Sequence, residues 1–333
     1  MGSLFPCLGD EIGWECLVRV ELNSHHNLRC VCKSWNAALK SPHFYQERKR
    51  LRISEQRICI LHDTPGPRDR VSLYDLAEKS CKTLAIPAEI YAIEHCHFVK
   101  QKLVFITHMS LHCGRNCVWL YDFACSKWRQ GAKAPKLRTE FATAADEEGG
   151  LIYMAGGHSR LREPIRSASV YNVEEDKWVV LPDMNTNMNN FRGVFADGKF
   201  YIMDNRYCRT IEVFDPYTRS WKTMENRFSN SHYFLSAFGR LHCFSDKGLI
   251  EYDYSQDKLN IVGTFPTEDW HLNIVFTVVF GDNIFVCRWD TVQGRSFYLL
   301  APPSERGGVF KCIGIDGPLG FQGYSIHAAT LDL

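Results

Sequence analysis

One unit recurs along the chain and restricts its fold more than any other feature. An aromatic residue and an Asp or Asn are followed by a short polar turn and then by a tryptophan, seven residues after the aromatic. An aromatic ring and an indole at this spacing, across a tight turn, are typical of a β-hairpin. The complete copies are Tyr121 with Trp128, Tyr171 with Trp178 and Phe214 with Trp221; Tyr74 with Cys81 and Tyr252 with Leu259 are degenerate, and Tyr298 lies in a sixth hairpin without the tryptophan.

The spacing of these units predicts a propeller. The leading aromatic residues follow one another at intervals of about 40–50 residues, the length of a four-stranded blade. A turn precedes each hairpin, and its glycine supplies a positive φ, as at Gly149-Gly150; Lys100-Gln101 is a version without glycine. In blade three we expect the strands, from the innermost outwards, at Phe141–Asp146, Leu151–Ala155, Ser169–Val173 and Lys177–Val180.

The two ends of the repeat region complement each other. The first hairpin repeat lacks an innermost strand, and the run Tyr324–Leu331 has no partner near it in the sequence. We therefore expect this run to supply the inner strand of blade one, which closes the ring and removes exposed sheet edges. The predicted fold class is mainly β: a six-bladed propeller over residues 57–333, closed by the C-terminal strand and preceded by a small all-α module over residues 1–50.

Residues 1–50 have a helical period. Ile12, Cys16, Leu17 and Val20 fall at helical steps. A second apolar face runs over Leu28–Leu39 and is expected to stop at Ser41-Pro42, and a short basic helix is expected over Phe44–Leu51.

Composition argues against several classes of protein. The net charge of +1 gives no footprint for nucleic acid or for an anionic membrane. The longest apolar run, near Ile274–Phe280, is too short to span a bilayer. There are 14 cysteines but no CxxC pair, and Met1–Asp10 does not resemble a signal peptide, so we expect reduced thiols in the cytoplasm or nucleus.

No cofactor, metal or catalytic residue is predicted. The chain has no Gly-x-Ser-x-Gly elbow. One His and Cys cluster could be considered for zinc, but it lacks a clean ligand pair, and His95 and His97 alternate as strand residues do. Its members are His95, Cys96, His97, His108, His112, Cys113 and Cys117.

Two sets of motifs resemble a known family. The double glycine followed by Tyr and Trp resembles the kelch repeat. Residues 4–46 resemble an F-box, most closely at Val31–Trp35, although Gly9 and Glu21 stand where that family usually has proline. Together the motifs resemble the plant F-box/kelch-repeat proteins. The resemblance implies a non-enzymatic substrate receptor of an SCF-type ubiquitin ligase, which promotes degradation of a target, for example a phenylpropanoid-pathway enzyme such as phenylalanine ammonia-lyase.

The helical module is the expected dock for a Skp-type adaptor and, through it, the cullin ligase core. It carries more apolar side chains than so short a segment can bury alone. The alternative is that these side chains pack on each other and on the propeller. The candidates are Leu8, Ile12, Leu17, Val31, Trp35, Leu39 and Phe44.

One face of the propeller is the expected site for a target protein. The loops between the second and third strands and those between blades share this face, called here the rim. They are rich in Arg, Trp, Tyr and His, and Arg, Trp and Tyr are enriched at binding hot spots; a merely solvated loop surface is the alternative. The candidates are Arg138, His158, Arg160, Arg162, Asn190, Arg192, Arg206, Tyr207, His232, Trp270, His271, Arg288 and Trp289.

Two other functions stay open at the level of sequence. The protein could be a kelch scaffold whose N-terminal helices merely cap the propeller. It could also be a kelch-fold, metal-dependent enzyme with its site in the central channel.

Overall fold

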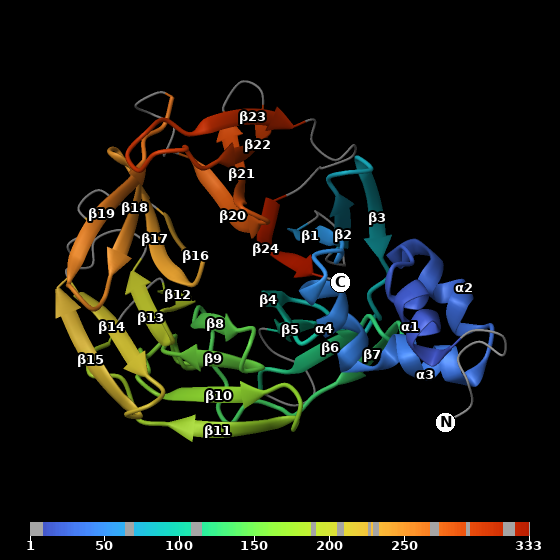
Figure 1. Cartoon of the computed structure of the whole chain (residues 1–333). Coiled ribbons are helices and arrows are strands. Elements are labelled where there is room, and N and C mark those ends of the chain that lie inside the picture. Colours follow the sequence, from blue (N-terminus) through green and yellow to red (C-terminus); the bar gives the residue numbers. More distant parts are fainter. Residues whose placement is uncertain are drawn as a thin grey trace.

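The computed structural model describes residues 9–63, 70–107, 115–187, 191–204, 210–225, 228, 233–266, 273–290, 294–315 and 324–332. Within these ranges the strands form six four-stranded antiparallel sheets. The sheets stand around a central axis, with the helices gathered on one side of the ring (Figure 1). The fold is a six-bladed β-propeller preceded by a small helical segment, as predicted.

The strands of each blade are given from the innermost to the outermost. Blade one is β24 (Tyr324–Asp332), β1 (Gln56–Asp63), β2 (Arg70–Asp75) and β3 (Ser80–Leu84); blade two is β4 (Ile93–Val99), β5 (Lys102–Thr107), β6 (Val118–Asp122) and β7 (Lys127–Gln130). Blade three is β8 (Ala142–Asp146), β9 (Leu151–Ala155), β10 (Ala168–Asn172) and β11 (Lys177–Leu181); blade four is β12 (Phe191–Ala196), β13 (Lys199–Asp204), β14 (Thr210–Asp215) and β15 (Ser220–Glu225). Blade five is β16 (Tyr233–Ala237), β17 (Arg240–Ser245), β18 (Gly248–Asp253) and β19 (Lys258–Gly263); blade six is β20 (Ile274–Phe280), β21 (Asn283–Asp290), β22 (Gly294–Ala301) and β23 (Lys311–Ile315).

The ring closes as predicted. Strand β24 pairs antiparallel with β1, so that Ile58 lies opposite Thr330 and Cys59 opposite Ala329. It also contacts the innermost strands of both neighbouring blades, β4 and β20. The last strand of the chain therefore completes blade one and joins it to blades two and six.

The recurring hairpin has a defined local cause. The acidic or amide residue after the leading aromatic accepts backbone N–H groups two and three residues further on, as Asp122 does from Ala124 and Cys125. The residue before the outer strand then takes a positive φ although it is not glycine, as Ser126 does at 54°. Equivalent side-chain turns occur at Asp75, Asn172, Asp215 and Asp253.

The repeated tryptophans join neighbouring blades. In each complete repeat the indole and the leading aromatic ring are cross-strand partners, with centroids 5.1 Å apart. The indole N–H donates to a carbonyl just after the outer strand of the preceding blade. These bonds run from Trp128 to Ala85 (2.9 Å), from Trp178 to Ala132 (2.8 Å) and from Trp221 to Pro182 (2.7 Å).

The helical module contains α1 (Asp10–Val18), the 3-10 turn η1 (Leu22–Ser24), α2 (His25–Arg29), α3 (Lys33–Lys40) and α4 (Pro42–Arg50). The single helix expected over Leu28–Leu39 is wrong. Cys32 is extended, with φ −158° and ψ 168°, and its sulfur accepts a hydrogen bond from Trp35 N, so a new helix begins there. Ser41 ends α3 and caps α4 with its hydroxyl, as the Ser-Pro pair indicates.

Across the described residues, no helix has the length and apolar character needed to cross a membrane.

Candidate functional site

Three of the predicted adaptor-binding residues form the interior of the helical module. Leu39 and Phe44 are fully buried and Leu17 is 1 % exposed. They pack with Val18 and Tyr45 in one cluster. These three side chains hold the helices together and so shape the module's surface without being part of it.

A buried arginine, Arg48, also stabilises the module, and the sequence pattern does not predict its burial. Arg48 Nη1 donates to the carbonyls of Val18 and Val20, both at 2.7 Å. Its Nη2 donates to Ile53 O at 3.2 Å and lies 3.3 Å from a carboxylate oxygen of Glu55. Because Glu55 also accepts the Leu22 N–H at 2.6 Å, this network joins three helical segments to the entry of β1.

The module contains a buried histidine with a depressed pKa. His25 is 1 % exposed and packs edge-on against Phe44, with centroids 5.3 Å apart. Its Nε2 lies 3.0 Å from Val20 O, while Nδ1 is buried without a hydrogen-bond partner in the described structure. Burial lowers the pKa of His25 to about 4, although the bond to Val20 acts in the opposite direction.

This histidine predicts an acid sensitivity. The unfolded chain, with a His pKa of 6.5, takes up the proton before the folded one does. The contribution of neutral, buried His25 to the unfolding free energy is therefore complete above pH 6.5, and it is lost as the pH falls towards 4. Between pH 7 and pH 5 the wild type should lose about 2 kcal/mol of unfolding free energy relative to His25→Gln, which stays neutral. Denaturant titrations at both pH values measure this, and an equal loss in the two proteins would contradict it.

Exposed apolar side chains remain on the module. Ile12 on α1 is 56 % exposed and Val31, between α2 and α3, is 60 % exposed. Trp35 on α3 is half-buried against the module core. Leu8 lies outside the described residues. We call Ile12, Val31 and Trp35 the adaptor surface; they are what the structure leaves accessible from the predicted set.

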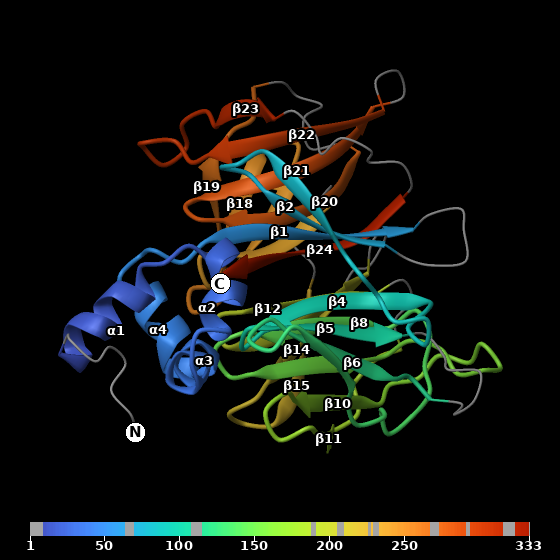
Figure 2. The same ribbon diagram turned by 90° about the vertical axis from the view of Figure 1, so that its right-hand side faces the viewer.

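The module contacts the propeller at the face opposite the rim. Arg29 Nη2 donates to Phe123 O at 3.2 Å, and Ala124 packs against the module core. Both lie in the turn between the third and fourth strands of blade two, at the other end of those strands from the rim. Figure 2 shows the helices standing beyond one face of the ring of blades. The adaptor surface and the rim are therefore borne on opposite faces.

The best-defined part of the rim is the segment 157–166 between β9 and β10, called here the blade-three loop. Ser159 Oγ accepts the N–H groups of Leu161 and Glu163, and Ser159 N donates to Glu163 O at 2.8 Å. His158 forms bridges with Thr139 and with Pro164 at the base of the loop. Arg160, Leu161 and Arg162 are exposed at the tip, Leu161 to 81 %. The loop thus presents two guanidinium groups and an apolar side chain on a hydrogen-bonded base.

Two acidic residues lie near the base of this loop, Glu140 exposed and Glu94 half-buried. Glu140 Oε2 is 3.3 Å from His158 Nδ1, and the backbone N–H of Glu140 donates to Glu94 Oε1 at 2.6 Å. Burial raises the pKa of Glu94 to about 7, against the hydrogen bond from Glu140, which lowers it. His158 is thus half-buried in a structural network, while the exposed charges of the loop are those of Arg160, Arg162, Glu163 and Arg166.

Arg138, predicted as a rim residue, is buried and does not reach the surface. Although the sequence places it in a loop between blades, its side chain is only 2 % exposed. Nη1 donates to Gly156 O at 3.0 Å and to Ser167 O at 2.7 Å, and Nη2 donates to Ser167 Oγ at 2.9 Å. Burial lowers the pKa of Arg138 to about 10. This arginine ties the two ends of the blade-three loop together from inside.

The other predicted rim residues are more scattered. Arg192 stacks on Tyr233 with its guanidinium carbon 3.7 Å from the ring centroid, and Tyr233 Oη accepts the Thr277 N–H at 3.1 Å, a contact chain across three innermost strands. Arg288 is half-buried and Trp289 is 44 % exposed at the end of β21. Outside the described residues lie Asn190, Arg206, Tyr207, His232, Trp270 and His271.

The considered zinc cluster is not assembled in the described part of the chain. No group of three His, Cys, Asp or Glu side chains there is placed to hold a metal ion. His95 and His97 instead lie with parallel rings 6.4 Å apart, and His97 is 2.8 Å from Thr143 Oγ1 of the next blade. His108, His112 and Cys113 fall outside the described residues.

Comparisons with known proteins match both parts of the chain. The F-box domain model matches residues 5–47 and the Kelch motif model matches residues 149–185. The chain is 28% identical over 249 residues to the F-box/kelch-repeat protein At1g80440 of Arabidopsis thaliana, covering 68% of this chain and 70% of the relative. It is 29% identical over 271 residues to the F-box/kelch-repeat protein At2g44130 of the same plant, covering 67% and 66%.

A third relative and a solved structure cover more of the chain. The F-box/kelch-repeat protein At1g26930 of Arabidopsis thaliana is 23% identical over 340 residues, covering 90% of this chain and 76% of the relative. The crystal structure of TolB from Acinetobacter baumannii matches with a TM-score of 0.56 and 12% identity, covering 84% of this chain and 67% of that one. At this identity the likeness to TolB shows the fold alone.

Proposed function

We propose that this chain, which matches the F-box domain and Kelch motif models and resembles F-box/kelch-repeat proteins, is a substrate-recognition subunit of an SCF-type ubiquitin ligase. The F-box module, over residues 1–50, binds a Skp-type adaptor and through it the cullin core, and the propeller, over residues 57–333, binds a target protein. The observation that supports the proposal is the placement of two exposed surfaces. Exposed apolar side chains lie on the module at one face of the propeller, and an exposed basic loop lies at the other.

In this proposal the chain itself catalyses nothing. Holding a target beside the ligase core raises its effective concentration there, and ubiquitin is transferred by other subunits. The cytoplasm or the nucleus is the expected compartment. The resemblance to plant proteins of this layout makes a phenylpropanoid enzyme such as phenylalanine ammonia-lyase the first target to test.

The blade-three loop indicates what the target's surface should carry. Arg160 and Arg162 are both exposed at the tip of a loop whose backbone is fixed by Ser159 and by Arg138. A complementary patch on the target is therefore acidic, with an apolar spot that receives Leu161. Charge complementarity of this kind affects the association rate and the choice of partner more strongly than it affects the affinity.

Adaptor binding can be tested by placing charges on the adaptor surface. The double variant Ile12→Asp and Val31→Asp should bind a purified Skp-type adaptor at least about 100-fold more weakly, because two carboxylates would be desolvated in an apolar contact. Neither side chain is buried in the module, so its fold should persist. Calorimetry or interferometry with the full chain measures the affinity.

The matched control is Val180→Asp. Val180 is 62 % exposed on the outer strand of blade three, about as exposed as Val31 at 60 %, but it lies on the propeller. This variant should bind the adaptor as the wild type does. Failure of the wild type to bind any Skp-type adaptor, or an equal loss in the control, would contradict the proposed function.

A further inference from the structure

The cleft between blades four and five lacks the indole that fills the clefts between blades one and two, two and three, and three and four. In blade five the leading aromatic, Tyr252, is paired across the hairpin with Leu259, where the three complete repeats have tryptophan. Leu259 packs, half-buried, against the core shared by these two blades. No indole therefore reaches from this position to blade four.

The cleft between blades two and three shows how a complete repeat closes. Trp178 donates to Ala132 O, and Asp176, whose carboxylate also accepts the Tyr171 hydroxyl, receives Ala132 N at 2.7 Å and the Arg129 guanidinium at 3.0 Å. Gly131 makes this approach possible, because a Cβ there would lie 2.5 Å from Tyr171 Oη. Small residues on one blade thus let the indole and the acidic turn of the next blade approach closely.

Between blades four and five the same positions are occupied by larger side chains. Counted from the tryptophan of the outer strand, Met224 and Glu225 stand where blade two has Gly131 and Ala132. Tyr252 still donates to Asp257 at 2.8 Å, as its counterpart does in blade three. A cavity of about 200 Å³ lies here, lined by Lys222, Thr223, Met224, Glu225, Tyr252, Tyr254 and Asp257.

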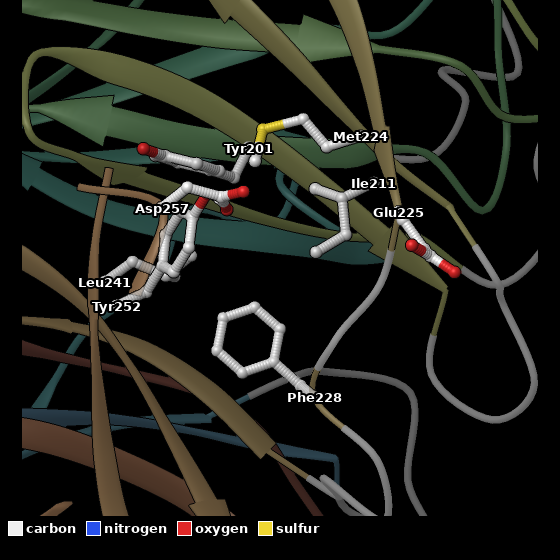
Figure 3. Close-up of a pocket in the computed structure, with 8 residues that line it drawn as sticks. All are labelled: Tyr201, Ile211, Met224, Glu225, Phe228, Leu241, Tyr252 and Asp257. Carbon is white, nitrogen blue, oxygen red and sulfur yellow. Dashed lines mark hydrogen bonds between the residues drawn. The ribbon is translucent and has the colours of Figure 1, made fainter. Parts of the chain in front are cut away.

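The cavity combines aromatic walls with hydrogen-bond acceptors. Tyr252 and Tyr254 line it together with the carboxylates of Glu225 and Asp257. Figure 3 shows an adjoining, much smaller space of about 10 Å³, which shares Met224, Glu225, Tyr252 and Asp257 with the cavity and is otherwise lined by Tyr201, Ile211, Phe228 and Leu241. Phe228 packs edge-on against Tyr252 with centroids 5.6 Å apart and lines this smaller space. Tyr201 is 1 % exposed, and its hydroxyl has no hydrogen-bond partner among the described residues. The carboxylates of Glu225 and Asp257 can accept an N–H.

We propose that this space, called here the Leu259 cleft, binds a flat aromatic group with a ring N–H, that is, an indole. The fold itself places this group in three equivalent clefts, where it packs at a tilt against the leading aromatic ring and donates its N–H to the neighbouring blade. A volume of 200 Å³ is below the roughly 300–1,000 Å³ of pockets for drug-sized ligands and suits one bicyclic ring. The indole comes from a tryptophan side chain of a partner or from a free small molecule.

The test uses indole and N-acetyltryptophanamide as probes of the full-length protein, observed by saturation-transfer NMR. A ring of this size should bind with a dissociation constant of about 1 mM. Leu259→Trp, which restores the repeat, should weaken binding of both probes at least about tenfold, because the protein's own indole occupies the space. Lys258→Trp adds an indole on the exposed neighbouring position of β19 and should leave binding unchanged.

A second variant guards against a folding defect. Tyr254→Ala removes a half-buried wall of the cleft and should weaken indole binding about fivefold in a protein that melts as the wild type does. Tighter binding of the amide than of indole assigns the site to a partner's tryptophan, and equal binding assigns it to a free ligand. No saturation transfer in the wild type, or undiminished binding in both Leu259→Trp and Tyr254→Ala, overturns the proposal. The cleft lies on the propeller, so its variants should bind the Skp-type adaptor as the wild type does, and this result separates the test from that of the proposed function.

Discussion

Ending the chain after Ile315 is expected to abolish cooperative folding of the propeller. The truncation removes β24, the innermost strand of blade one, and leaves the inner edge of β1 without a partner. It also removes Leu331, which is fully buried in the core between blades one and two, and the contacts of β24 with β4 and β20. A net stability of about 5–15 kcal/mol does not survive the loss of one strand at the centre of three blades.

Circular dichroism melts and gel filtration measure this effect. The truncated chain should show no cooperative transition and should elute as an aggregate through its unpaired edge. A chain that ends at Asp332 is the control, because it keeps every described pair of β24, and it should melt as the full chain does. A cooperative transition at the wild-type temperature in the truncated chain would show that the ring does not depend on this closure.

Arg138→Met is the second change with a large expected effect. It removes a buried guanidinium that donates to Gly156 O and Ser167 O and leaves these acceptors in a site closed to water. The backbone of Arg138 is held in addition by reciprocal bonds with Asn116, so the chain path cannot easily move to compensate. The unfolding free energy should fall by about 3–5 kcal/mol.

Lys136→Met is the matched control for this variant. Lys136 lies in the same connection between blades and is exposed, so the same kind of substitution should change the unfolding free energy by less than about 0.5 kcal/mol. Equilibrium denaturation in urea gives both values. Equal, small effects in the two variants would mean that Arg138 is a surface residue after all.

The propeller could be predicted from the sequence because each repeat contains the residues that form its own turn and its contact with the preceding blade. The side-chain turn at Asp122 and its equivalents fixes the hairpin, and the indole of Trp128 and its equivalents fixes the neighbouring blade. Both depend on residues close together in the chain, so their spacing is visible as a period. Closure by β24 followed from counting strands, since one blade lacked an inner strand and one run lacked a partner.

Burial of polar side chains could not be predicted in the same way. Arginine is seldom buried, so the sequence predicts Arg138 at the surface and does not indicate the buried role of Arg48. Their partners are carbonyls distant in sequence, such as Ser167 O for Arg138 and Val18 O for Arg48, and no local pattern marks them. The same holds for Arg192, which stacks on Tyr233 of the next blade.

The adaptor residues show a related limit. A helical period identifies an apolar face, but it does not tell whether that face meets a neighbouring helix or a partner. Leu17, Leu39 and Phe44 meet neighbouring helices, and Ile12 and Val31 do not. The break at Cys32 was hidden because residues on both sides of it fall at helical steps. The rim residues in loops outside the described structure stay predictions.

The measurement that tests the account most directly is affinity capture from cells treated with a proteasome inhibitor, followed by quantitative mass spectrometry. Wild-type protein should retain a Skp-type adaptor together with a target. The variant Ile12→Asp with Val31→Asp should lose the adaptor at least about tenfold and keep the target, while Arg160→Glu with Arg162→Glu should do the reverse. Loss of both partners in each variant, or of neither, would contradict two separate binding surfaces on opposite faces of the propeller.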